Sequence, residues 1–473
     1  MTSWSRGNKV LALTSVGVML VSLDISIVNV AFGSLVAEWP ESRRLLTWVF
    51  SAYNIAYAAG LLTAGRLADA FGRKRAFLSG LTVFMIGSLL CAISPSAFFL
   101  VFARVIQALG GAIISPSAIA LVLPEFPVEK RSAAIGIWGA VGAVAAASGP
   151  TIGGLLVDSL TWHWIFLVNV PFCILAIVIG RGLLHESRDE SAPRSVDFSG
   201  ALLAVMGVGV LTLVIVQSDQ WGWLSNRSLL ISALSVVALL AFALRCNRTS
   251  HPLLDLKLFR LRFVTASAFS GFGFSAGFFS LIFVNTQWLQ TVWGYSPSRS
   301  GLAGIPGPIM AALVAAPAGR AAQRFGHGKV VALGGVILCS GTLLLSATIT
   351  ETPNYLLYYL PVTVYTGVGV GLCISTISSA ATAFLPRTQF AMGSALNNTI
   401  RQVGAALGIA LISSILITAG NSGDPLSGFH QSWRVTSAII LIAGIGMMVL
   451  FRRPTSEQLA AADSVRNQGG KSS

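Results

Sequence analysis

The sequence predicts an all-α integral membrane protein with fourteen transmembrane helices and both termini in the cytoplasm. Of its 473 residues, 54% are hydrophobic and only 10% are charged. Its apolar runs repeatedly reach the ~20 residues that a helix needs to cross a bilayer. Helices are favoured in lipid because they satisfy their own backbone hydrogen bonds. The alternation of polar and apolar residues that a membrane β-barrel requires is absent throughout the sequence.

Fourteen apolar runs mark the expected transmembrane helices. In chain order they cover residues 10–33, 45–65, 76–94, 97–123, 133–157, 163–180, 199–217, 228–244, 263–289, 300–318, 330–349, 355–381, 391–417 and 435–451. The first run follows basic residues, as the apolar part of a signal peptide does. It is too long for one, contains Asp24 and lacks a small-residue cleavage site, so we expect an uncleaved first span.

The basic residues set the expected orientation, because cytoplasmic loops retain Lys and Arg. With both termini in the cytoplasm, 24 of the 31 Lys and Arg residues fall in cytoplasmic segments and five fall in outside loops. The other two, Arg104 and Arg401, lie within predicted spans. The net charge of +14 is therefore a topology signal, and it requires no nucleic-acid partner.

Nothing in the sequence indicates an enzyme or a cofactor. It contains no nucleotide-binding loop and no nucleophile with a matching base. Its five cysteines do not have the spacing of metal ligands. We therefore expect a protein that is not an enzyme and that needs neither a metal nor an organic cofactor.

The longest polar interruption, "HESRDESAPRSVD" at residues 185–197, follows the sixth span and divides the chain. A weak internal repeat supports this division, since "GRLADAFGRKR" at 65–75 and "GRAAQRFGHGK" at 319–329 agree at five of eleven positions. Transporters are commonly built from such repeats. The predicted parts are a six-helix bundle (1–184), a cytoplasmic linker (185–198), two inserted transmembrane helices (199–261), a second six-helix bundle (262–451) and a disordered cytoplasmic tail (452–473).

The loop at 65–75 can be explained by its residue types. Gly65 and Gly72 permit a tight turn and close helix approach, Asp69 can cap a helix or form an ion pair, and Arg73 and Lys74 hold the loop in the cytoplasm. The same stretch resembles the signature loop between the second and third spans of the major facilitator superfamily. The resemblance implies the major facilitator fold.

Five further stretches resemble the fourteen-span drug/proton antiporter branch of that superfamily. They are "LDISIVNVAF" (23–32), "RVIQALGGA" (104–112), "SGPTIGG" (148–154), "WHWIFLVNVP" (162–171) and "NNTIRQVGAALG" (397–408). Ala108 and Ala145 stand where this branch usually has glycine, and both replacements are small. The resemblance implies efflux of a hydrophobic or amphipathic small molecule, such as a drug, antibiotic or secondary metabolite. It also implies alternating access with the proton as coupling ion.

Asp24 is the only acidic residue deep within a predicted span. An ionised carboxylate there costs several kcal/mol, so Asp24 should be protonated for part of the time or face a cavity or a cation. It lies about 22 Å along its helix from Lys9, a depth compatible with Arg104, about 10 Å below the outer boundary. The two can form a purely structural ion pair. Alternatively, as the resemblance implies, the pair opens when Asp24 takes a proton and couples transport to proton movement.

The fifth span carries a stripe of small residues, which includes Gly149, Pro150, Gly153 and Gly154. Small residues let another helix approach closely, and a proline weakens the local backbone ladder. One interpretation is plain helix packing. The other, which the resemblance implies, is that this helix governs closure between the two halves and marks an exporter.

Polar and aromatic residues in four spans are candidates for contact with a substrate. They are Tyr53, Asn54 and Tyr57 in the second span, Gln107 in the fourth, Phe272, Phe279, Phe283 and Gln287 in the ninth, and Asn397, Asn398 and Arg401 in the thirteenth. The phenylalanines share one side of their helix, which is either an aromatic binding face or a lipid-facing surface. Arg401 can bind an anionic group of a substrate or stabilise the domain interface.

Two other functions are compatible with this architecture: uptake of a small solute by symport, and movement of a lipid or other amphiphile between leaflets. The "SGPTIGG" stretch and the branch resemblance favour export. The expected partners are a small-molecule substrate and the lipid bilayer, and we expect a monomer. Arginine outnumbers lysine 25 to 6, and alanine and glycine are abundant. This composition favours a bacterial source with a GC-rich genome, and hence the inner (cytoplasmic) membrane.

Overall fold

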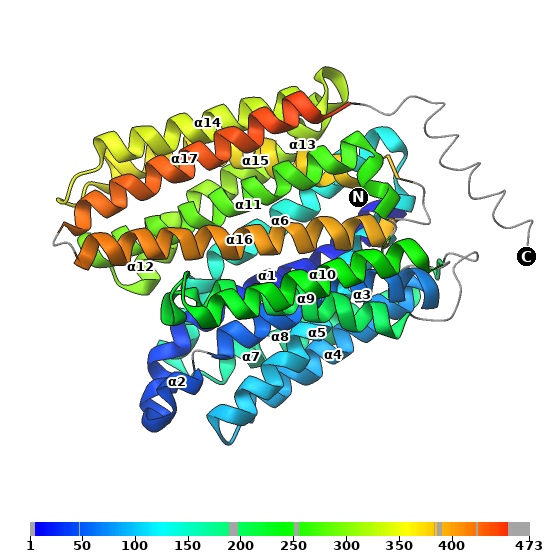
Figure 1. The fold of residues 1–473 in the computed structure, drawn as a ribbon, viewed down its shortest axis with the longest axis horizontal. Coiled ribbons are helices and arrows are strands. Elements are labelled where there is room, and N and C mark those ends of the chain that lie inside the picture. The colour runs from blue at the N-terminus through cyan, green and yellow to red at the C-terminus, as the bar shows by residue number, and fades with distance from the viewer. Residues whose placement is uncertain are drawn as a thin grey trace, which may run out of the picture.

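The computed structural model of the chain describes residues 5–46, 48–188, 197–249, 254, 256–382, 384–385, 390–421 and 424–452. Every regular element in these ranges is helical. Long helices run side by side across the molecule, and α1 begins and α17 ends at the same end (Figure 1). An even number of membrane crossings requires this placement of the two ends. The predicted all-α membrane fold is confirmed.

The N-terminal half forms one bundle, drawn from blue to green-cyan (Figure 1). Its helices are α1 (Arg6–Glu38), α2 (Arg43–Leu46), α3 (Trp48–Phe71), α4 (Arg73–Ala92), α5 (Ala97–Val122), α6 (Val128–Ser159), α7 (Trp164–Leu167) and α8 (Asn169–Leu183). Within it, α1 packs on α5, α6 and α8, and α5 also packs on α3 and α4. The short α7 and the longer α8 follow one another closely, because only Val168 separates them.

The next two helices, α9 (Phe198–Trp221) and α10 (Asn226–Arg248), form an antiparallel hairpin. The hydroxyl of Ser235 on α10 donates to the carbonyl oxygen of Gly207 on α9, at 2.8 Å. Helix α9 also packs against α3 of the N-terminal half and against α16 of the C-terminal half. The hairpin therefore lies along one side of the contact between the halves.

The C-terminal half forms the second bundle, drawn from green to red (Figure 1). Its helices are α11 (Arg262–Gln287), α12 (Pro297–Gly304), α13 (Pro306–Phe325), α14 (His327–Thr348), α15 (Leu360–Thr382), α16 (Phe390–Asn421) and α17 (Pro425–Leu450). It meets the N-terminal half along two lines, which together we call the seam. On one line α6 packs on α12, α13 and α15, and on the other α3 and α5 pack on α16.

Thirteen stretches of helix in the described residues are long and apolar enough to cross a membrane. They correspond to thirteen of the fourteen predicted spans. The exception is the run at 45–65, which lies in α3, a 24-residue helix of the same bundle. This helix carries Arg66 and Asp69 near its C-terminal end, which lowers its mean hydropathy. The count of fourteen spans stays a prediction.

Several helices extend beyond the predicted apolar runs. The largest difference concerns α17, which begins at Pro425, ten residues before the predicted run. Asp424 caps this helix, since its carboxylate accepts a hydrogen bond from the backbone N–H of Ser427 at 3.1 Å. A proline in the first helical position needs no hydrogen-bond partner for its nitrogen. Polar first turns of this kind are invisible to a search for apolar runs.

The internal repeat has a structural counterpart at two glycines. Gly72 joins α3 to α4 with a φ of 111°, and Gly326 joins α13 to α14 with a φ of 95°. Other residue types rarely adopt a positive φ, so each junction depends on glycine. These glycines occupy equivalent positions in the two repeated stretches.

Most of the predicted linker (189–196) and nearly all of the predicted tail (453–473) lie outside the described residues. The proposed domain boundaries therefore stay predictions.

Candidate functional site

The centre of the N-terminal half contains an ion pair that is sealed from solvent. Nη1 of Arg104 on α5 donates to Oδ2 of Asp24 on α1, at 2.5 Å. The two side chains are 1% and 0% exposed. Asp24 and Arg104, which the sequence placed at compatible depths in the membrane, therefore form an ion pair in the structure.

Three neutral side chains complete the hydrogen bonding of this pair. Nε2 of Gln107 donates to Oδ1 of Asp24 at 2.8 Å and to the hydroxyl of Ser88 at 2.7 Å. Nδ2 of Asn169 donates to the same Asp24 oxygen at 3.2 Å. Nη1 of Arg104 also donates to Oε1 of Gln107 at 2.6 Å. We call Asp24, Arg104, Gln107, Ser88 and Asn169 the paired site, and it joins α1, α4, α5 and α8.

Aromatic side chains cover the guanidinium of Arg104. Its Cζ atom lies 4.0 Å from the ring centroid of Tyr53 and 5.8 Å from that of Phe166. Its Nε donates to the carbonyl oxygen of Val49 at 3.2 Å. Rings with an exposed π-face attract a cation, and they also exclude water from it. The paired site is consequently a dry, fully connected polar network.

Sequence reasoning found Asp24, Arg104 and Gln107 but assigned Gln107 to substrate contact. The structure places Gln107 in hydrogen-bond contact with both Arg104 and Asp24, and its substrate contact stays a prediction. The sequence analysis did not identify Ser88 and Asn169 as members of the network. Asn169 lies in the quoted stretch "WHWIFLVNVP", where an amide at the start of an apolar helix was the available signal.

A second polar cluster surrounds Arg401 on α16. Its Nε donates to the hydroxyl of Ser275 on α11 at 3.2 Å, and its Nη1 donates to that of Ser378 on α15 at 3.3 Å. Among the described residues, no carboxylate forms an ion pair with Arg401. Asn397 and Asn398 lie one turn earlier on the same helix. We call these five residues the Arg401 site.

The Arg401 site lies beside the seam. Nε2 of Gln402 on α16 donates to Oδ1 of Asn54 on α3 at 3.2 Å, which links the two halves. Tyr57, one turn after Asn54, lies within electrostatic range of Arg401. The hydroxyl of Tyr57 shares a hydrogen bond with that of Ser115 on α5 at 2.8 Å. Asn54 and Tyr57 of the second span therefore lie beside the thirteenth span, whereas Tyr53 covers Arg104 in the paired site.

The signature loop is held in a compact form by two sets of interactions. Arg73 forms a buried ion pair with Asp69, with Nη2 and Oδ1 2.9 Å apart. The carboxylate of Glu186 accepts hydrogen bonds from the backbone N–H groups of Lys74 and Arg75, at 3.1 and 3.2 Å. The chain after α8 thus holds the first turn of α4. Gly65 is buried within α3.

The glycines of α6 pack tightly against α1. A Cβ atom on Gly149 would lie 1.9 Å from Oγ of Ser26, and one on Gly153 would lie 2.8 Å from the carbonyl oxygen of Ile27. Neither position can hold a side chain unless the helices separate. Pro150 lies within the continuous helix α6, and Gly154 is buried. The other face of this helix contacts α13 and α15 of the C-terminal half.

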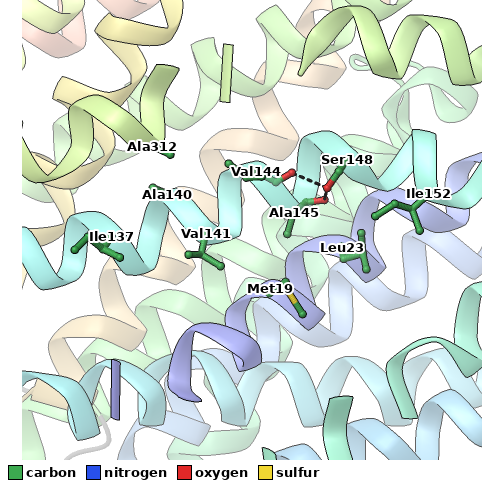
Figure 2. Close-up of a pocket in the computed structure, with 10 residues that line it drawn as sticks. All are labelled: Met19, Leu23, Ile137, Ala140, Val141, Val144, Ala145, Ser148, Ile152 and Ala312. Carbon is green, nitrogen blue, oxygen red and sulfur yellow. Dashed lines mark hydrogen bonds between the residues drawn. The ribbon is translucent and has the colours of Figure 1, made fainter. Parts of the chain in front are cut away.

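An apolar cavity of about 320 Å³ opens beside α1, α6 and α13. Figure 2 shows its lining side chains, most of them on α6. They are Met19, Leu23, Ile137, Ala140, Val141, Val144, Ala145, Ser148, Ile152 and Ala312. The hydroxyl of Ser148 donates to backbone carbonyl groups of its own helix, so it presents little polarity to the cavity.

None of the residues proposed for substrate contact lines this cavity. Phe272 on α11 is 36% exposed on the surface of the bundle. Phe279 makes an edge contact with its neighbour Phe278, and Phe283 packs on the core of the C-terminal half. Gln287 ends α11 and is partly buried. A substrate role for these four residues stays a prediction.

No group of His, Cys, Asp and Glu side chains suited to a metal ion occurs in the described part of the chain. At the end of the hairpin where α9 begins and α10 ends, Arg245 donates a hydrogen bond to Asp197 at 2.8 Å, and this bond lowers the pKa of the carboxyl. This ion pair ties the ends of the hairpin together.

Comparisons with known proteins identify the family. A family profile described as "Major Facilitator Superfamily" matches residues 14–246 and 267–470. The chain is 34% identical over 410 residues to "Multidrug resistance protein Stp" of Mycobacterium tuberculosis, which covers 86% of this chain and 75% of that protein. It is 30% identical over 463 residues to "Methylenomycin A resistance protein" of Streptomyces coelicolor, which covers 96% and 94%.

The fold also matches a solved structure. The proton:xylose symporter XylE, bound to 6-bromo-6-deoxy-D-glucose, superposes with a TM-score of 0.67 at 14% identity. The match covers 97% of this chain and 99% of that one. At this identity the likeness concerns the arrangement of the helices.

Proposed function

Because the chain belongs to the major facilitator superfamily, a family of transporters, we propose that it exports a hydrophobic or amphipathic small molecule in exchange for protons. The related proteins that are named for multidrug and antibiotic resistance support export. In this proposal a monomer in the inner membrane of a bacterium alternates access between the two sides. It uses no cofactor other than the coupling proton.

The observation that carries the proposal is the fully buried ion pair of Asp24 and Arg104. A carboxylate in the membrane interior is stable only while a cation and hydrogen-bond donors compensate its charge. Protonation of Asp24 removes that charge and leaves Arg104 without its counter-ion. The hydrogen-bond network must then rearrange, and this alters the contacts of every helix that contributes a side chain to it.

A chain of helix contacts connects the paired site to the seam. Helix α1 carries Asp24 and packs on α6 through the close glycine contacts at Gly149 and Gly153. Helix α6 in turn packs on α12, α13 and α15 of the C-terminal half. A shift of α1 relative to α6 would therefore alter the contact between the halves. Two-state contacts of this kind convert a local charge change into a movement of domains.

The substrate path in this proposal follows the seam. The apolar cavity beside α1, α6 and α13 accepts the apolar body of a substrate that arrives from lipid. The polar residues around Arg401 lie beside the other line of contact between the halves. Opening of the seam toward one membrane face at a time would release the substrate on the outside.

The test begins with cells that carry or lack the protein, grown on a panel of antibiotics and dyes that includes methylenomycin A. The compound with the largest change in resistance then serves as substrate for the full chain in lipid vesicles with an imposed pH gradient. Wild-type protein should concentrate it against its gradient. Asp24→Asn should insert and fold but lose this uphill transport, whereas the exposed outer residue control Asp158→Asn should retain it.

Each other result contradicts part of the proposal. A protein that changes resistance to no compound is not an exporter of drugs. Substrate accumulation in the direction of the proton flow identifies an uptake symporter. Movement of labelled lipid between leaflets, with no transport of the selected compound, identifies a lipid translocator. Uphill transport by Asp24→Asn removes this residue from proton coupling.

A further inference from the structure

Arg401 is a cation inside the membrane that has only neutral partners in the described structure. A guanidinium has five N–H donors. Two hydrogen bonds of Arg401 are formed, to the hydroxyls of Ser275 and Ser378, and both are long at 3.2 and 3.3 Å. The guanidinium of Arg104, by contrast, has a carboxylate at 2.5 Å. An anion is the partner that Arg401 lacks.

Two amides beside Arg401 also have unused hydrogen-bonding atoms. Nδ2 of Asn398 and Oδ1 of Asn397 are buried without a partner. Residues three and four positions apart share a helix face, so both amides adjoin the guanidinium. A buried amide nitrogen without an acceptor costs free energy, and an oxygen atom of a bound anion would satisfy it. The Asn398 amide nitrogen and the guanidinium thus call for the same kind of ligand, whereas the Asn397 oxygen requires a hydrogen-bond donor.

The contacts of Arg401 do not support a role in holding the two halves together. Ser275 and Ser378 lie on α11 and α15, within the same half as Arg401. One hydrogen bond that crosses the seam comes from the next residue, Gln402, to Asn54. Gln402, rather than Arg401, therefore links the two halves.

A glycine allows Arg401 and Asn397 to pack closely against α11. A Cβ atom on Gly271 of α11 would lie 3.3 Å from Cγ of Arg401 and 3.3 Å from Oδ1 of Asn397. Contacts this short are tighter than ordinary packing allows, so a side chain at this position would press on both groups. Tyr57, across the seam, adds an aromatic surface within electrostatic range of the guanidinium.

We propose that the Arg401 site binds the anionic group of the substrate, so that this exporter selects amphiphiles with a carboxylate, sulfonate or phenolate on an apolar or aromatic body. The inference rests on the proposed export function and specifies its substrate class. The guanidinium receives the anion, Asn398 donates the additional hydrogen bond, and the apolar body lies along the seam. A cationic compound would meet repulsion from Arg401. Asp24 offers it no compensation, because its carboxylate is already paired.

The test compares two fluorescent probes with the same aromatic skeleton. One is 1-anilinonaphthalene-8-sulfonate and the other is N-phenyl-1-naphthylamine, which lacks the sulfonate. Binding to purified full-length protein in zwitterionic lipid nanodiscs is measured near neutral pH, with empty nanodiscs as the blank. There is no pH gradient, so this equilibrium measurement does not depend on proton coupling.

Wild-type protein should bind the sulfonate more tightly than the neutral probe after correction for partition into lipid. Arg401→Gln should weaken sulfonate binding about tenfold or more, because it removes a charge-assisted hydrogen bond, and should leave the neutral probe within about twofold. Arg401→Lys should be intermediate, since lysine keeps the charge but loses the planar fork. The matched control is Arg299→Gln, at an arginine that stacks on Tyr295 near the outer end of α12. It should match wild type for both probes.

The proposal is overturned if wild type does not prefer the sulfonate, or if Arg401→Gln keeps the preference. An equal loss of both probes, with a lower unfolding temperature, would identify a structural residue instead. The variant Asp24→Asn, assayed for uphill transport in vesicles, tests the coupling proposal separately. If it still pumps uphill, the coupling proposal fails while the anion site stands. If coupling is lost but no variant discriminates between the probes, the anion site fails alone.

Discussion

Arg104 and Arg401 are the two arginines inside predicted spans, and their surroundings differ in every respect that matters for a charge. Arg104 has a carboxylate at 2.5 Å, a glutamine at 2.6 Å and an aromatic ring over its face, and it is 1% exposed. Arg401 has two serine hydroxyls beyond 3 Å and is partly exposed. The protein itself compensates the charge of Arg104. In our proposal, the charge of Arg401 is compensated by a bound anion.

The difference indicates a division of labour between the halves. A network built around a compensated ion pair changes when one member changes its charge, which suits a site that responds to protons. A cation with neutral partners changes when an anion arrives, which suits a site that responds to substrate. Export against a gradient requires both responses, with the seam between them.

The largest expected effect comes from removing each cation by the same substitution. Arg104→Met leaves the Asp24 carboxylate buried without a counter-ion, and we expect a loss of about 3–5 kcal/mol of stability. Arg401→Met removes a cation that has no ion-pair partner among the described residues, so its stability should be unchanged or higher. The unfolding midpoints of both variants, measured in detergent by fluorescence-detected gel filtration, check this contrast.

The matched control for that contrast is the double variant Arg104→Met with Asp24→Asn. Because it removes both charges, it should recover much of the lost stability and still fail in uphill transport. Equal destabilisation by the two single variants would mean that Arg401 has a hidden counter-ion. The comparison between the two sites would then be wrong.

A smaller effect is expected from deleting one neutral partner at each site. Asn169→Ala removes a hydrogen bond to the Asp24 carboxylate, and uphill transport should fall about tenfold, since bonds to charged groups are worth about 1.5–3 kcal/mol. Ser275→Ala removes a long bond to Arg401, and uphill transport should stay within about twofold of wild type. Transport rates at a fixed pH gradient in vesicles measure both. A reversed order would show that the Arg401 site controls coupling.

Much of the fold was predictable because the bilayer imposes strong rules on sequence. The lengths of apolar runs and the positions of basic loops locate helices and orient them. Asp24 and Arg104 could be paired from depth alone, since charges are rare in spans and must compensate one another. The polar first turns of helices such as α17 were not predictable, because their capping depends on single side chains.

The neutral members of the paired site were much harder to find. Ser88 and Asn169 come from α4 and α8, and serine or asparagine within a span is too common to identify a network. The cavity beside α6 was invisible because its lining is made of ordinary apolar residues, such as Val141 and Ile152. The shape of a cavity depends on how neighbouring helices pack against one another. The hydropathy of a sequence does not specify this packing.

The smallest expected effect concerns a third arginine, Arg245, which sharpens the comparison by adding an ion pair with an exposed cation. Its side chain is 40% exposed and lies 2.7 Å from Asp197, which precedes the first turn of α9. Solvent and salt screen such pairs, so Asp197→Asn should lower the unfolding temperature only slightly, far less than Arg104→Met does. Arg245→Gln should have the same small effect, and the double variant should add nothing further.

The pH dependence of this effect has a definite sign. The hydrogen bond from Arg245 lowers the pKa of Asp197 in the folded protein below the ordinary value of an aspartate, about 3.9. Stability from the pair is therefore fully present above that value and is lost as the pH falls through the lower, folded-state pKa. The difference in unfolding temperature between wild type and Asp197→Asn should be constant near neutral pH and vanish in strong acid. A difference that grows as the pH falls would mean that the carboxyl is stabilised in its protonated form, against the hydrogen bonding seen here.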